Sequence, residues 1–244
     1  MAKVLALLIL LLAARQAAAA DPGYYLVSVY ENEGEKSIDF RYWTVKFPGS
    51  PEVRWPELGF SYGVTKRWTT EVFASYIGSR KMGTRISTLN WQNDYLLTQG
   101  QYPFDLAVHT NLISYREAGA GYALEAGPVV QTEVGRTQLN ANVFLDRSYH
   151  GTERSRAQMK YQWQARYRWK PGFQFGVQGF GELGDWDHWA PHGKQSHRAG
   201  PVISGTLPLG SGTQALKYQV AYLGGSIRGR HGKMLSMRLQ YVFD

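Results

Sequence analysis

The sequence predicts an all-β fold: an antiparallel transmembrane β-barrel of about twelve strands, preceded by a cleavable signal peptide. Polar and apolar residues alternate at period two in one segment after another, with turn residues between the segments. Glycine (27 residues) and aromatic residues (14% of the chain) are abundant, which is typical of tight turns and of rings at a membrane interface. The chain has no cysteine, so disulfides and a lipid anchor on cysteine are both excluded.

The N-terminus has the form of a secretory signal peptide. Lys3 precedes an apolar run over residues 4–14, and alanines occupy residues 17–20. This arrangement predicts cleavage after Ala20, since a retained membrane helix would need about 20 apolar residues. We therefore expect residues 1–20 to be the signal peptide, residues 21–37 to be a periplasmic N-terminal segment or short strand, and residues 38–244 to form the barrel.

The clearest strand runs from Met159 to Trp169. Its odd positions are all apolar or aromatic and its even positions are Lys, Gln or Arg, so the two sets lie on opposite faces of a strand. A soluble β-sandwich would alternate as well. However, the segments at 122–134, 157–169 and 214–227 exceed the usual length of about 5–6 residues for a soluble strand. Short connections also alternate with longer loops, which favours a membrane barrel with short turns in the periplasm.

The last strand carries a feature that barrel-assembly machinery commonly recognises. That signal is a final strand with apolar residues at alternate positions and an aromatic residue at its end. Leu239, Tyr241 and Phe243 resemble it, although Asp244 follows the final aromatic residue. We therefore expect the assembly machinery to be a partner through this strand, and the bacterial outer membrane to be the location.

Four stretches resemble a family of uncharacterised, signal-peptide-bearing outer-membrane proteins of proteobacteria. They are GFSYGVTKRWTTEVFASY (59–76), LNWQNDYLLTQGQYPFDL (89–106), YQWQARYRW (161–169) and SHRAGPV (196–202). The resemblance spans nearly the whole mature chain and implies a barrel in the outer membrane, without an assigned substrate or catalytic residues. More loosely, the architecture resembles outer-membrane transporters encoded with aromatic-degradation pathways.

Charged residues at alternate positions are expected to line the lumen. These candidates are Glu71, Asp94, Asp105, Glu125, Glu133, Lys160, Arg166, Arg168, Lys217 and Arg238. They have two interpretations: an ion-pair network that fills the interior, because buried charges need partners, or a narrow polar pore that orients solutes. Barrels of about eight strands have filled interiors, and those of about sixteen strands have open ones. A barrel of twelve strands lies between these sizes, so the strand number does not decide between the two interpretations.

The segment 185–197 contains His188, His192 and His197 with two aspartates and two tryptophans. These residues could ligate Zn²⁺ or Cu²⁺, but their irregular spacing favours a folded loop at the rim. An outer-membrane hydrolase would need an acidic residue with histidine, or a serine such as Ser114 with His109. No nucleophile motif surrounds a serine, so we expect neither catalysis, nor a cofactor, nor a metal.

The formal charge of +8 is not accompanied by a nucleic-acid-binding motif. The basic residues of the outer loops are instead expected to face lipopolysaccharide, whose phosphates pair well with Arg and Lys. The candidates are Arg80, Lys81, Arg154, Arg228 and Arg230. The leading function is a narrow passive pore for small polar or amphipathic solutes. A filled structural or lipopolysaccharide-binding barrel is the alternative, and a hydrolase is third.

Overall fold

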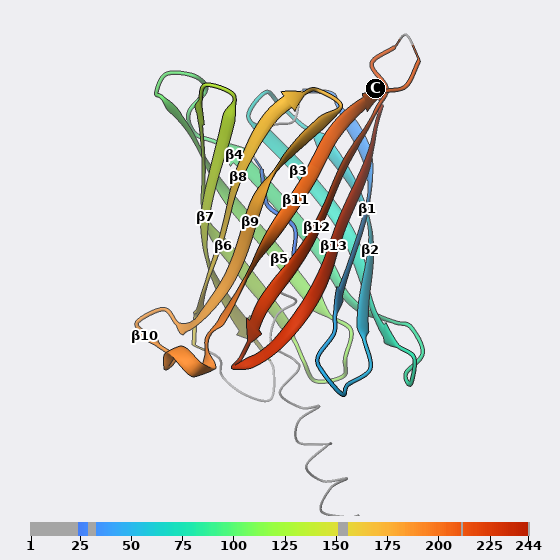
Figure 1. Cartoon of the computed structure of the whole chain (residues 1–244), viewed down its shortest axis with the longest axis vertical. Helices are drawn as coiled ribbons and strands as arrows, with labels where there is room; N and C mark the ends of the chain where they lie inside the picture. The colour runs from blue at the N-terminus through green and yellow to red at the C-terminus, as the bar shows by residue number, and fades with distance from the viewer. Residues whose placement is uncertain (1–23, 29–32, 151–155, 211, 244) are drawn as a thin grey trace, which may run out of the picture.

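The fold is a closed antiparallel β-barrel (Figure 1). The computed structural model describes residues 24–28, 33–150, 156–210 and 212–243, so the expected signal peptide lies outside the described residues. The elements are β1 (Lys36–Val45), β2 (Val53–Gly63), β3 (Trp68–Ser79), β4 (Arg85–Leu96), β5 (Phe104–Tyr115), β6 (Tyr122–Val134), β7 (Thr137–Tyr149), β8 (Gln158–Lys170), β9 (Phe173–Asp185), β10 (His188–Trp189), the 3-10 turn η2 (His192–Lys194), β11 (Ser196–Pro208), β12 (Ala215–Ile227) and β13 (Arg230–Phe243).

Consecutive long strands pair with each other around the barrel, with β9 pairing with β11, and β1 pairs with β13 to close the cylinder. The two-residue β10 pairs only with the end of β9, so twelve strands form the wall, as the sequence predicted. Closure is a requirement in hydrocarbon, where the polar groups of an open strand edge would have no partner. No helix in the described part of the chain is long and apolar enough to span a membrane.

The alternation of side chains is confirmed along β8. Trp163 and Trp169 are exposed on the outer face, whereas Lys160 and Gln164 are buried. The same arrangement is seen in β7, where Leu139, Val143 and Leu145 are exposed and the polar residues between them are buried. The barrel is therefore apolar outside and polar inside, the pattern of a wall that faces lipid.

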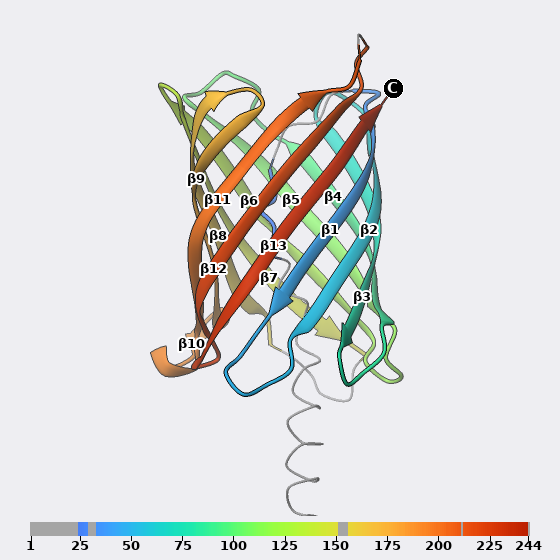
Figure 2. The same ribbon diagram turned by 45° about the vertical axis from the view of Figure 1, so that its right-hand side comes forward.

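The two ends of the barrel differ (Figures 1 and 2). One end holds short connections, such as Gly135-Arg136 between β6 and β7, together with the start of β1 and the end of β13. The other end holds longer connections, including the one that carries β10 and η2. Since outer-membrane barrels keep their short turns in the periplasm, we call these the turn end and the loop end.

Two glycines of β9 allow large rings to lie flat on the outer face. Gly179 pairs directly with Trp163, and Gly181 pairs with Tyr161. A Cβ atom at Gly179 would overlap the indole of Trp163, and one at Gly181 would overlap the phenol of Tyr161. The absence of a side chain at these two positions thus lets β8 and β9 pack closely.

Gly179→Ala is therefore expected to destabilise the barrel by about 1–3 kcal/mol, because the methyl group must displace the indole. Gly224→Ala is the matched control, since a Cβ at Gly224 meets no atom within 4 Å. Heat-modifiable mobility on SDS gels measures both variants. Equal unfolding midpoints for Gly179→Ala and Gly224→Ala would contradict the packing role.

Candidate functional site

The candidate site is the polar interior of the barrel. Charged residues that the sequence places on inward positions are buried there and form two networks. The first centres on Arg41 of β1, whose guanidinium lies 2.9 Å from Asp39 and 2.5 Å from Glu71 of β3. Arg238 of β13 binds the same Asp39 oxygen at 2.5 Å. Strands β13, β1 and β3 are thus joined across the inside of the wall by paired charges.

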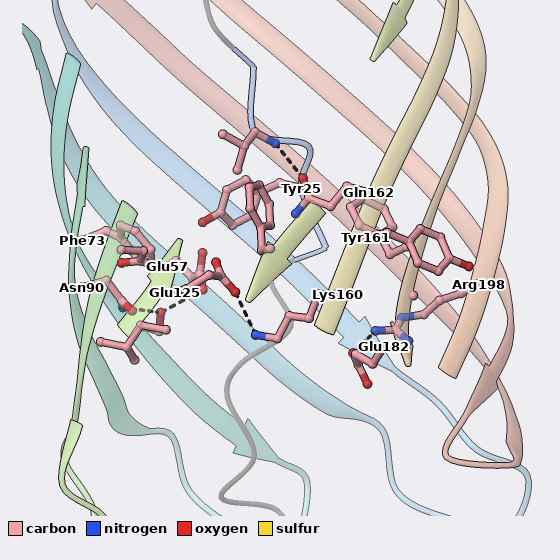
Figure 3. A pocket seen from close by; sticks show the side chains of 17 residues that line it. Tyr25, Glu57, Phe73, Asn90, Glu125, Lys160, Tyr161, Gln162, Glu182 and Arg198 are labelled. Atoms are coloured by element: carbon pink, nitrogen blue, oxygen red, sulfur yellow. Dashed lines mark hydrogen bonds and ion pairs between the residues drawn. The ribbon is translucent and has the colours of Figure 1, made fainter. Parts of the chain in front are cut away.

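The second network centres on Lys160 of β8. Its ammonium lies 2.9 Å from Glu125 of β6 and 3.0 Å from Asp146 of β7. Glu125 also lies 3.7 Å from Nε2 of His109, while Nδ1 of His109 lies 2.7 Å from Asp94 of β4. This chain of charges crosses five neighbouring strands, β4 to β8, and Figure 3 shows the Lys160–Glu125 contact as a dashed line.

The ten residues predicted to line the lumen occupy different environments. Glu71, Asp94, Glu125, Lys160 and Arg238 belong to the two networks above. Lys217 is paired with Glu35 at 2.7 Å. Glu133 and Arg168 pair with each other at 2.5 Å, but about two fifths of each side chain is exposed, so they lie at the rim. Asp105 also lies near the turn end, where it accepts from the backbone of Gly100.

Arg166 differs from these because its two hydrogen-bond acceptors are neutral. Its guanidinium donates to Gln138 of β7 at 2.8 Å and to Ser204 of β11 at 3.2 Å. It can reach β11 because its partner on the intervening β9 is Gly176. Amide side chains surround this part of the wall, including buried Gln131, Asn140, Gln164 and Gln178. Arg166 thus provides a positive charge among uncharged polar groups.

Residues 24–28 lie inside the barrel and take no part in the sheet. This differs from the expectation of a periplasmic segment or a short strand, and β1 begins at Lys36 instead of residue 38. The backbone of Val27 donates to Gln162 at 3.0 Å and accepts from Asn142 at 2.9 Å. Side chains of the wall therefore provide the hydrogen-bond partners that a neighbouring strand would otherwise provide for the backbone of this segment (Figure 3).

Two apolar patches in the lumen receive this segment. Tyr24 packs in the first, which is formed by Trp43, Val45, Phe180, Val202, Ala221, Leu223 and Met234. Tyr25 and Val27 pack in the second, which is formed by Leu96, Ala107, Val129 and Phe144. These wall residues are apolar on inward positions, where a barrel in lipid normally carries polar side chains. Their burial against the segment accounts for the exception.

Two arginines of the wall lie over the tyrosine rings of the segment. The guanidinium of Arg41 is 3.9 Å from the ring centroid of Tyr25, and that of Arg198 is 4.4 Å from the ring centroid of Tyr24. Such cation–π contacts are stronger when both groups are buried. Tyr25 also donates to Gln92 at 3.4 Å. The segment is therefore held by specific contacts on opposite sides of the lumen.

The segment separates two cavities. One, of about 30 Å³, is lined by Glu125, Lys160 and Arg198 among others; the second, of about 90 Å³, lies toward the turn end and is lined by Lys66, Asp94 and Arg238 among others. Tyr25 and Val27 line both cavities. Each cavity has room for only a few water molecules, and side chains of residues 24–28 form part of the lining of both.

Two of the three histidines of residues 185–197, His192 and His197, form a small ring cluster at the loop end. Nδ1 of His197 lies 2.8 Å from the hydroxyl of Tyr161, and the rings of His192 and His197 stack with centroids 5.6 Å apart. Among the described residues, no group of three or more His, Cys, Asp or Glu side chains could hold a metal ion. The contacts are those of a folded loop against the outer wall.

The residues considered for hydrolysis are not brought together. His109 is buried on an inward position of β5, whereas Ser114 occupies a position of the opposite parity, so the two side chains leave opposite faces of the strand. Both ring nitrogens of His109 face carboxylates, those of Asp94 and Glu125. This geometry suits a structural ion pair, and it offers no serine nucleophile next to the imidazole.

The basic residues predicted to face lipopolysaccharide are spread along the loop end. Arg80 and Lys81 are exposed in the connection from β3 to β4, and Arg228 is exposed between β12 and β13. Arg230 lies over the ring of Phe47 at 4.3 Å. Arg154 lies outside the described residues.

Sequence reasoning missed Asp39 and Arg41 as members of the lumen wall. Both were detectable, because they alternate with Ile38, Phe40 and Tyr42, which face outward. It also missed the docked segment, for which a weaker signal existed. Residues 24–27 are aromatic or apolar without alternation, which is typical of a segment that is surrounded on all sides and unlike a wall strand.

Comparison with solved structures identifies the same fold in proteins of very different sequence. An outer membrane channel from Pseudomonas putida F1 is 12% identical with a TM-score of 0.59, covering 91% of this chain and 98% of its own. The KdgM porin in complex with disordered oligogalacturonate (10% identical, TM-score 0.60) and the NanC porin (10%, 0.57) each cover 85% of this chain and 99% of their own. No family model and no curated protein matches the sequence.

The chain thus has the twelve-stranded barrel fold that these outer-membrane proteins share. The identities are too low to carry a substrate from these proteins to this one. The interior of this barrel combines paired charges on the wall with a chain segment inside the lumen.

Lys160→Met is expected to destabilise the barrel by about 3–5 kcal/mol, because Glu125 and Asp146 would lose the cation that separates them. Lys217→Met is the matched control. It removes a lysine whose side chain is 34% exposed, so the loss should stay below about 1 kcal/mol. Denaturant unfolding in detergent micelles measures both, and an equal loss in the two variants would contradict a buried network around Lys160.

Proposed function

We propose that this protein is a narrow passive pore of the bacterial outer membrane for small polar or amphipathic solutes, closed at rest by residues 24–28. The observation that carries this proposal is the segment itself. A barrel whose wall side chains filled the interior would leave no room for a polypeptide to cross it. The wall here encloses enough space for an additional chain segment, and that space is the proposed path.

The mode of attachment supports a closure that can be reversed. The segment ends eight residues before Lys36, where β1 begins, and residues 24–28 dock through side-chain contacts and no strand ladder. Burial of an apolar side chain contributes about 1.5–3 kcal/mol, while ordering a residue costs about 1–2 kcal/mol of backbone entropy. The two are of similar size, so the net free energy that holds the segment in place is small.

The composition of the wall supports a polar or amphipathic solute. Once the segment leaves, the lumen would present amides and paired charges beside two apolar patches, the surfaces that now contact Tyr24 and Tyr25. A solute with both polar and apolar parts would find partners on this wall. The similar folds of one outer membrane channel and two porins agree with transport.

Replacing Tyr24 and Tyr25 together by Ala is expected to raise single-channel conductance several-fold in planar bilayers, because the ring contacts that hold the segment are lost. Tyr95 and Tyr222, which are exposed on the outer face, provide the control: their double replacement by Ala should leave conductance unchanged. A correctly folded Tyr24→Ala, Tyr25→Ala protein that conducts no more than the wild type would refute the closure.

Arg166→Glu is expected to shift the ion selectivity of the open pore toward cations, because a positive charge with neutral partners becomes negative. Reversal potentials in a salt gradient measure the shift. Arg54→Glu changes charge by the same amount at an exposed position of β2 and should have little effect. Equal reversal potentials for the two variants would exclude Arg166 from the conducting path.

A further inference from the structure

We propose that the loop-end rim at β1 and β13 binds a phosphate group of a glycolipid in the outer leaflet. Lys46, just after β1, and Lys233 of β13 are directly opposite each other. They exchange both backbone hydrogen bonds, at 2.9 and 3.0 Å, and both residues are exposed. Like charges in this relation destabilise a sheet. An anion bound beside these two side chains would offset the repulsion.

The position of the lysines fits a lipid headgroup. Met234 and Ser236 of β13 are buried on inward positions, while Leu235 is 37% exposed on the outer face. Lys233 has the parity of Leu235 and is the next outward position toward the loop end. The two lysines therefore stand at the edge of the lipid-facing surface, the level at which basic side chains reach headgroups.

A third cation contacts the same connection between β1 and β2. Lys46 donates from Nζ to the carbonyl oxygen of Ser50 at 2.6 Å, and Arg230 donates from Nη2 to the hydroxyl oxygen of Ser50 at 3.3 Å. The guanidinium of Arg230 lies over the ring of Phe47, 4.3 Å from its centroid. The connection from β1 to β2 and the start of β13 thus hold two cations around one serine.

The acidic residue of this connection does not neutralise the group. Glu52 is bound by Arg54, with Nε and Oε1 3.1 Å apart, so its charge is already compensated. The site consists of Lys46 and Lys233, whose ammonium groups suit phosphate oxygens, while Arg230 adds positive charge on the lumen side of the same rim. The occupant is a phosphorylated glycolipid and not a protein partner, because the lysine pair borders the apolar surface that faces lipid.

This inference does not depend on a conducting lumen, and it is tested separately. The purified barrel in detergent micelles is titrated with lipopolysaccharide and with the same glycolipid after enzymatic removal of its lipid A phosphates. Native mass spectrometry measures binding, and the thermal unfolding midpoint measures protection. The wild type is expected to bind the phosphorylated form several-fold more tightly and to be protected by it.

Replacing Lys46 and Lys233 by Gln is expected to abolish this preference for the phosphorylated form. Without glycolipid, the variant should unfold at the same temperature as the wild type or higher, because the repulsion between the lysines is removed. A merely structural role for these side chains predicts the opposite shift. Lys170→Gln, at an exposed position of the turn end, is the control and should keep the preference.

Three results would overturn the proposal. The first is equal binding of the phosphorylated and dephosphorylated glycolipids by the wild type. The second is a Lys46→Gln, Lys233→Gln protein that retains the preference. The third is equal protection of the wild type by inorganic phosphate at the same concentration, which would assign the rim to free anions.

Discussion

The structure depends on one constraint: within a membrane every backbone polar group must find its partner inside the protein. Twelve strands meet this condition only by closing, through the pairing of β1 with β13. Closure then fixes the side chains, because each residue must face either lipid or lumen. The charged residues on the inner face are consequently buried. Because a buried charge needs a partner of opposite sign, they form pairs such as Arg41 with Glu71 and Lys160 with Asp146.

The closed wall encloses more space than its own side chains fill, and residues 24–28 occupy part of it. This explains why an otherwise polar inner face includes Trp43, Phe180 and Met234, which pack with Tyr24. The same contacts connect fold to function. A segment held by side chains can leave without breaking the sheet, whereas removal of a wall strand would open the barrel. We therefore place the change between closed and open states in the segment.

The wall was predictable from the sequence, whereas the contents of the lumen were not. Alternation between Met159 and Trp169 determines the direction of every side chain in β8, and the ends of β6 and β12 were predicted to within one residue. Which charged side chains pair with each other depends on how neighbouring strands are aligned. The alternation of residues within one strand does not give that alignment. Thus Lys160 was expected to face inward, but not its contacts with both Glu125 and Asp146. Tyr24 and Tyr25 were missed because a segment without a strand partner leaves no alternation to detect.

The central claim is that residues 24–28 close a conducting path, and a reversible tether tests it most directly. The chain contains no cysteine, so Val27→Cys and Asn142→Cys would introduce the only two thiols, at residues already joined by a 2.9 Å hydrogen bond. Single-channel conductance is recorded with the pair oxidised and then reduced, beside each single-cysteine variant. The account predicts silence when the disulfide tethers the segment and recovery of conductance on reduction. Equal conductance in the oxidised and reduced states would contradict it.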